Sequence, residues 1–145
     1  MKPLKTWIVL ADATSLRLAV NEGPGKGVYG LPDPGLFAAP VTELSDEPGV
    51  AHASVGPNRG GISDPDLKKQ ALAVFADDIV GFLMQARKEK SFHRFILSAP
   101  PTMLGILRQK LTPDLQAVLH AEIPKDLTHL PLDDLPAHLA DVIAV

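Results

Sequence analysis

The chain has no cysteine, few aromatic residues and no long hydrophobic run, and each absence excludes a class of protein. Without cysteine it can form no disulfide, carry no catalytic thiolate and bind no zinc through cysteine. Five Phe, one Trp and one Tyr are few for a surface that stacks nucleic-acid bases. No segment approaches the ~20 apolar residues that a membrane-spanning helix requires.

The N-terminal apolar run also differs from an export signal. It extends only from Trp7 to Ala11 before Asp12 interrupts it. A secretory signal needs roughly 7–15 apolar residues followed by a small-residue cleavage site. We therefore expect no secretory signal and predict a cytoplasmic location. A literal adhesin would instead have to be found outside the cell.

The composition that is present is typical of one ordinary globular domain. The chain has 145 residues, of which 46% are hydrophobic and 21% charged, enough to bury a single core. The net charge of −3 argues against a large basic surface for duplex nucleic acid. We predict a single domain over residues 1–145.

The hydrophobic pattern predicts an α/β fold with a mixed central sheet of about five strands and helices packed on it, in the order β-β-β-α-β-α-β-α. Leu16, Leu18 and Val20 alternate with Arg17 and Ala19, which is typical of a strand with one exposed face. Strands are expected at 7–11, 16–20, 40–44, 95–98 and 118–123, and helices at 63–88, 102–111, from 112 onward and 132–142.

Two segments rich in Gly and Pro, 21–35 and 45–62, are predicted to be loops, the second of them mobile. The first long helix is expected to begin at Ser63, because Ser63 or Asp64 can cap it and Pro65 suits the first helical position.

A buried strand leads directly into a helix between Phe95 and Leu111, where Pro100 and Pro101 separate the two. Open α/β sheets usually place their binding site at such a joint. Ser98 lies there, but a nucleophile elbow would need Gly-x-Ser-x-Gly. We therefore predict that the Ser98 hydroxyl satisfies local backbone groups.

Several local strings, together with the order of elements, resemble the bacterial host-attachment protein family. They are Trp7–Ala13, Phe95–Arg108, Ile123–Thr128 and the closing helix that contains His138. The most specific of them is the strand, Ala-Pro-Pro turn and Leu-Gly-x-Leu-Arg helix. The resemblance spans nearly the whole chain. It implies a fold similar to the ribonuclease H-like middle domain of archaeal and eukaryotic peptide-chain release factors.

The same resemblance implies a role in attachment to host cells and assigns no reaction. We interpret the chain as a non-enzymatic cytoplasmic binding or adaptor protein. The alternative is an RNA-, tRNA- or ribosome-binding protein linked to translation, or a divergent hydrolase related to release-factor middle domains. In those domains the corresponding loop carries Gly-Gly-Gln, whereas here Gly60 and Gly61 precede Ile62. Because Ile62 stands where that glutamine would be, the resemblance does not carry the glutamine's hydrolytic role over to this loop, and the divergent hydrolase stays an alternative.

The Gly-rich segment before Ser63 is the candidate binding site. Two glycines and an arginine ahead of a helix could admit a phosphate through backbone N–H groups and one positive charge. The alternative is a flexible loop whose arginine is only solvated. Lysines early in the helix would add two positive charges, a footprint for single-stranded RNA or tRNA. The candidate residues are Asn58, Arg59, Gly60, Gly61, Lys68 and Lys69.

No catalytic, metal or cofactor site is predicted. In ribonuclease H-like nucleases an acidic residue on the first strand helps to hold Mg²⁺, but such a site needs further carboxylates. We therefore interpret Asp12 as a turn residue. The histidines include no i,i+4 pair; they are His52, His93, His120, His129 and His138.

The sequence does not identify the binding partner of the protein. RNA or the ribosome is one hypothesis. A second copy of the chain is another, because the expected edge strand at Val41–Leu44 could pair with its equivalent.

Overall fold

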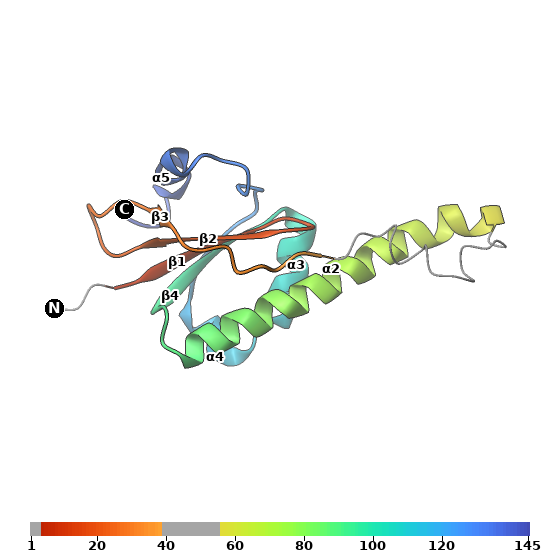
Figure 1. Ribbon diagram of the computed structural model, residues 1–145, viewed down its shortest axis with the longest axis horizontal. Helices are drawn as coiled ribbons and strands as arrows, with labels where there is room; N and C mark the ends of the chain where they lie inside the picture. The colour runs from red at the N-terminus through yellow and green to blue at the C-terminus, as the bar shows by residue number, and fades with distance from the viewer. Residues whose placement is uncertain (1–3, 39–55) are drawn as a thin grey trace.

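The computed structural model describes residues 4–38 and 56–145, and its centre is a five-stranded sheet in the order β3-β2-β1-β4-β5 (Figure 1). β2 is antiparallel to both β1 and β3, whereas β1, β4 and β5 run parallel to one another. The strands are β1 (Thr6–Ala11), β2 (Leu16–Asn21), β3 (Tyr29–Gly30), β4 (Arg94–Ser98) and β5 (Leu119–Ile123). The predicted α/β class with a mixed sheet is confirmed.

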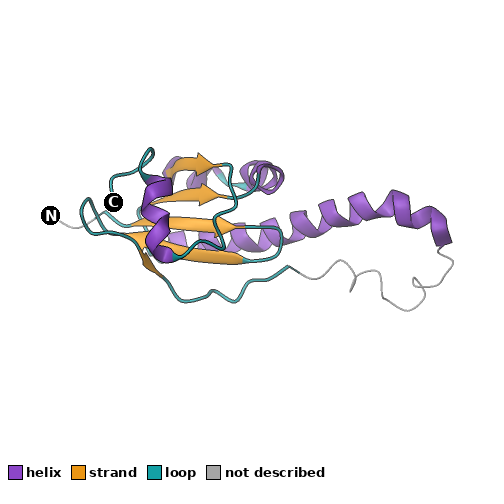
Figure 2. Ribbon diagram, turned by 90° about the horizontal axis from the view of Figure 1, so that it is seen from above, coloured by secondary structure: helices purple, strands orange, loops and turns teal. Residues whose placement is uncertain are grey.

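Helical segments cover both faces of the sheet (Figure 2). One face packs against three helices: α2 (Gly56–Lys88), α3 (Pro101–Lys110) and α4 (Pro113–Val118). The other face packs against the C-terminal segment, which contains the 3-10 helix η2 (Leu132–Asp134) and α5 (Leu135–Leu139).

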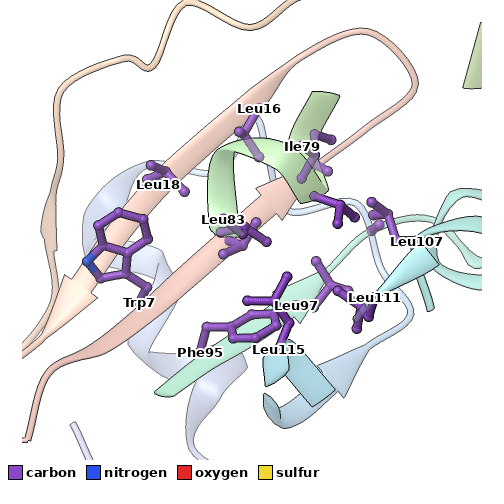
Figure 3. Close-up of a cluster of buried hydrophobic side chains, with 14 of the residues drawn as sticks. Trp7, Leu16, Leu18, Ile79, Leu83, Phe95, Leu97, Leu107, Leu111 and Leu115 are labelled. Atoms are coloured by element: carbon purple, nitrogen blue, oxygen red, sulfur yellow. The ribbon is translucent and has the colours of Figure 1, made fainter. Parts of the chain in front are cut away.

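The strand β1 is buried on both faces because its apolar residues alternate between two cores. Trp7 and Val9 belong to the cluster formed with α2, α3 and α4, whereas Ile8 and Leu10 belong to the cluster formed with the C-terminal segment. Continuous apolar runs are what a strand buried on both faces requires. In the first cluster, Leu83 of α2 lies close to β1 (Figure 3).

The prediction that one face of β2 is exposed to solvent is wrong. Ala19 is fully buried in the second cluster, and Arg17 is half-buried. The period-2 pattern is real, but the C-terminal segment covers the face that the sequence suggested was open to water. Ala19 is small enough to be buried under this segment, and Arg17 can bury its aliphatic stem there while its guanidinium reaches polar groups.

The expected third strand at 40–44 lies outside the described residues. A two-residue strand, β3, instead lies in the segment predicted to be a loop, where Tyr29 pairs with Val20 and Gly30 with Ala19. The sequence did not predict β3 because two residues are too few to show an alternating pattern and because the glycines and prolines around them indicate a loop.

The start of α2 is also corrected. The helix begins at Gly56, seven residues before Ser63, so the part of the predicted loop from Gly56 to Ile62 is helical. Pro57 is the second residue of the helix and supplies the same start signal as Pro65. Extending a helix that already exists is also far less costly than nucleating one. The rest of that predicted loop lies outside the described residues.

The remaining helices and the last strand agree closely with expectation. The hydroxyl of Thr112 caps α4 by accepting a hydrogen bond from the backbone N–H of Leu115 at 3.3 Å. The final helix is shorter than predicted, because η2 and α5 divide the expected segment. None of the helices in the described ranges is long and apolar enough to cross a membrane.

Neighbouring residues of α2 test how much the first core contributes. Leu83 is fully buried, whereas Met84 is 37% exposed. We expect Leu83→Ala to lower the free energy of unfolding by about 2–5 kcal/mol, since it leaves a cavity. Met84→Ala, the control, should cost less than about 1 kcal/mol. Urea denaturation measures both values, and equal losses would contradict the packing described.

Candidate functional site

The parallel strands bring their carboxyl ends to one edge of the sheet, where polar side chains gather. Asp12 directly follows β1, Ser98 ends β4, and residues 124–131 follow β5. We call this last segment the 124–131 loop. Open α/β sheets place ligands at such an edge, which makes it the candidate functional site.

Asp12 organises the turn between β1 and β2. Its Oδ1 accepts hydrogen bonds from the backbone N–H groups of Thr14 at 2.8 Å and Ser15 at 2.7 Å, and from the Ser15 hydroxyl at 3.1 Å. The predicted role of Asp12 as a turn residue is confirmed.

The second carboxylate oxygen of Asp12 faces the 124–131 loop. Asp12 Oδ2 accepts a hydrogen bond from the hydroxyl of Thr128 at 3.1 Å and lies 3.6 Å from His129 Nε2. Asp126 Oδ1 accepts from the backbone N–H of Thr128 at 3.0 Å and also faces its hydroxyl. We call Asp12, Asp126, Thr128 and His129 the Asp12 cluster.

Arg17 and Ser98 hold the loop in place through its backbone. Arg17 Nη1 donates to the carbonyl oxygens of Thr128 at 3.2 Å and Leu130 at 2.5 Å. The Ser98 hydroxyl donates to the carbonyl oxygen of Lys125 at 2.7 Å. Ser98 is fully buried, so its predicted structural role is confirmed, but the backbone group that it satisfies is 27 residues away along the chain and is not local.

The Asp12 carboxyl is stabilised in its ionised form. Burial raises its pKa, but hydrogen bonds from the Thr14 and Ser15 backbone and from the Ser15 and Thr128 hydroxyls outweigh burial, so the pKa lies below its ordinary value. The Asp12 cluster therefore contains a carboxylate, not a carboxylic acid, at neutral pH. This arrangement suits binding of a positive group better than proton donation.

Three residues of the Asp12 cluster together resemble a metal-ligand set. Asp12, Asp126 and His129 each offer one ligand atom, and these atoms lie within 4.8 Å of one another. Carboxylate oxygen and imidazole nitrogen are both common ligands of divalent cations.

The sequence matches the protein family described as "Protein required for attachment to host cells" over residues 7–139. The chain belongs to this host-attachment family. The match includes every strand of the described sheet except the first residue of β1, and it includes the Asp12 cluster. The resemblance inferred from local strings is thus confirmed at the level of the family. No curated protein matches the sequence.

The residues predicted as a binding site in this host-attachment protein lie on α2, and none of them belongs to the Asp12 cluster. Asn58, Arg59, Gly60 and Gly61 lie in its first turns, but the structure describes only their backbone. Lys68 and Lys69 are both exposed. A helix separates positions 59 and 68 by nine residues, roughly 14 Å along its axis and about half a turn around it. The helix thus spreads these charges along its length, and their binding role stays a prediction.

Sequence reasoning missed Asp126, Thr128 and His129. A signal was available, because Asp-x-Thr is a turn motif in which the Asp side chain accepts from the backbone two residues later. The decisive contact was not visible, since Thr128 meets Asp12 across 116 residues of chain. A search for histidine pairs at helical spacing could not find His129, because its neighbour is the distant Asp12 and not a second histidine.

Asp12 should contribute strongly to the stability of this edge. Asp12→Ala leaves the Thr14 and Ser15 N–H groups without their acceptor, and we expect it to lower the free energy of unfolding by about 1.5–3 kcal/mol. Asp12→Asn retains one acceptor oxygen and should cost less, about 1 kcal/mol.

The control for this test is Asp33→Ala. Asp33 Oδ1 accepts a hydrogen bond from the Gly35 N–H in an exposed turn, so its loss should cost less than about 1 kcal/mol. Chemical denaturation in the presence of EDTA compares the three variants without any metal contribution. An Asp12→Ala value no larger than that of Asp33→Ala would contradict the central role of Asp12.

Proposed function

We propose that this member of the host-attachment family is a non-enzymatic binding or adaptor protein that acts in the cytoplasm and influences attachment to host cells. The observation that carries the proposal is the length of α2, which extends past the sheet (Figure 1, Figure 2). The family supports the link to attachment, and the helix supplies a surface for a partner.

The dimensions of α2 show how much of it lies beyond the sheet. Its 33 residues span about 50 Å, whereas a six-residue strand such as β1 spans only about 20 Å. Among its described side chains, which begin at Asp66, the first buried one is Phe75. Of the described side chains of α2 before Phe75, only that of Leu72, which is half-buried, packs against the first cluster.

The described part of this extension combines positive charge with apolar surface. Lys68 and Lys69 are exposed, Leu67 and Ala71 are half-buried, and Val74 is 61% exposed. An exposed helix with adjacent basic and apolar residues is suited to packing against an acidic, partly apolar protein surface. We call residues 66–74 the α2 extension.

The carboxyl edge of the sheet supports a non-enzymatic role. Ser98 is buried and its hydroxyl donates to the protein backbone, which leaves it unsuited to attack a substrate. One oxygen of Asp12 is occupied by the turn that it organises. The Ser98 hydroxyl thus holds the 124–131 loop, and Asp12 Oδ1 holds the turn between β1 and β2.

Charge reversal on the α2 extension tests the adaptor function. We expect Lys68→Glu combined with Lys69→Glu to lower attachment to host cells about tenfold or more, because several unfavourable charge contacts would oppose the partner. The matched control, Lys26→Glu combined with Lys88→Glu, changes two other exposed lysines by the same total charge and should retain attachment. Counting attached cells of a deletion strain complemented with each variant measures the effect.

Affinity capture from the same strains identifies the partner. The adaptor function predicts a protein captured from the cytosolic fraction by the unaltered chain and the control, and lost with the α2 extension variant. Equal attachment by all three complemented strains would contradict the proposal, and so would recovery of the chain only outside the cell.

The second candidate function is binding of RNA, tRNA or the ribosome, favoured by the exposed Lys68 and Lys69 on α2. Two basic residues of α3 have carboxylate neighbours: Lys110 Nζ lies 2.9 Å from Asp77 Oδ1, and Arg108 pairs with Glu122. Neutralisation of these cations makes α2 the more suitable place for a phosphate backbone.

RNA recovered after crosslinking tests this second function. Arg59→Ala, Lys68→Ala and Lys69→Ala together should reduce the recovered RNA at least about tenfold at physiological salt, because three phosphate contacts are removed. Replacing Lys26, Lys88 and Lys125 by Ala, which removes the same charge outside residues 56–74, should not. Unchanged RNA recovery with the α2 variant, or no RNA with the unaltered chain, would exclude this function.

A further inference from the structure

The Asp12 cluster brings together two ligand types from distant parts of the chain. Asp12 follows the central strand, whereas Asp126 and His129 lie in the 124–131 loop. The arrangement is not a local turn, because Arg17 and Ser98 independently hold the backbone of that loop against the sheet. The ligand atoms are therefore positioned by the fold and not by one another alone.

The hydrogen bonds of Asp12 leave one oxygen available for a cation. Its Oδ1 is occupied by the turn, with the Thr14 and Ser15 N–H groups and the Ser15 hydroxyl as donors. Its Oδ2 receives only the Thr128 hydroxyl among the described donors, and it faces His129 Nε2 at 3.6 Å. A carboxylate oxygen can accept more than this.

The balance of charge in the cluster also favours a cation. Two carboxylates, Asp12 and Asp126, face the single hydroxyl of Thr128, and that hydroxyl has one proton to donate. The nearby Arg17 guanidinium hydrogen-bonds to backbone carbonyls of the loop. A divalent cation would satisfy both carboxylates at once.

We propose that Asp12, Asp126 and His129 form a binding site for a divalent transition-metal cation, with Zn²⁺ as the best match. This inference does not depend on the proposed adaptor function. It assigns a ligand to the carboxyl edge of the sheet, whereas the adaptor function rests on α2.

The ligand types and spacing favour Zn²⁺ over Mg²⁺. Zn²⁺ accepts imidazole nitrogen and carboxylate oxygen at about 2.0–2.2 Å, which places two tetrahedral ligands roughly 3.3–3.6 Å apart. The 3.6 Å between Asp12 Oδ2 and His129 Nε2 already meets that spacing. Mg²⁺ prefers an octahedron of oxygen ligands and rarely uses imidazole.

His129 can complete the site with little rearrangement of the fold. Its side chain is 82% exposed, whereas that of Asp12 is only 13% exposed. An exposed imidazole can rotate toward the cation while the carboxylate stays fixed by its turn. Three protein ligands leave a fourth position for water or for a carboxylate or phosphate group of a ligand.

Binding would join the end of β1 to the 124–131 loop by a metal link. Because the ligands are separated by more than a hundred residues of chain, the cation would stabilise the native state and not the unfolded chain. Added Zn²⁺ should therefore raise the midpoint of thermal unfolding.

Isothermal titration of the untagged full chain with Zn²⁺, after dialysis against EDTA, tests the site. We expect one Zn²⁺ per chain. His129→Ala and Asp126→Asn should each weaken binding at least about tenfold, since each removes or weakens a direct ligand. Asp126→Asn keeps an oxygen that can accept from the Thr128 N–H, so the loop should remain folded.

Matched controls separate this site from general surface binding. His138→Ala and Asp133→Asn alter exposed residues outside the Asp12 cluster and should leave Zn²⁺ affinity unchanged. Circular dichroism and thermal unfolding without metal should be the same for all four variants and the unaltered chain. Zn²⁺ should then raise the melting temperature of the control variants but not that of His129→Ala.

Three results would overturn the proposal. The first is the absence of Zn²⁺ binding at micromolar concentration, which would leave the 3.6 Å approach of His129 Nε2 to Asp12 Oδ2 without a metal role. The second is an equal loss of affinity in His138→Ala and His129→Ala, which would indicate general binding to surface histidines. The third is displacement of Zn²⁺ by an equimolar amount of Mg²⁺, which would show that the imidazole is not a ligand.

Discussion

Because β1 is buried on both faces and hydrogen-bonded on both sides, the position of every described layer depends on it. Its residues alternate between two cores, one shared with α2, α3 and α4 and the other with the C-terminal segment. It pairs antiparallel with β2 and parallel with β4. A shift of β1 by one residue against its neighbours would move each of its side chains from one core to the other. The packing of both cores therefore depends on the same strand register.

The same strand determines where the polar groups of the chain meet. β1 ends at Ala11, so Asp12 is the first residue that can reach beyond the sheet edge. The two carboxylate oxygens of Asp12 have different partners. Oδ1 accepts hydrogen bonds in the turn that leads into β2, and Oδ2 faces Thr128 and His129. The chain belongs to the family described as "Protein required for attachment to host cells".

Local patterns predicted the elements well where each has a strong signal of its own. The run from Trp7 to Ala11 predicted β1, and the Pro100–Pro101 joint predicted the change from β4 to α3. Weak or competing signals failed. β3 has two residues and no period, and two prolines, Pro57 and Pro65, both offered a start for α2. The neighbours that cover Ala19 of β2 are distant in sequence, so its pattern was misread as exposed.

By itself the sequence determined the α/β class, the strand–turn–helix joint, the family and the role of Asp12 in its turn, because each depends on residues close together in the chain. Only the tertiary structure decided that α2 extends beyond the sheet and that Asp12 meets Thr128 and His129. The physical reason is that parallel strands collect their carboxyl ends at one edge. Residues far apart in the chain become neighbours at this edge, and the spacing of residues along the sequence does not predict which of them will be in contact.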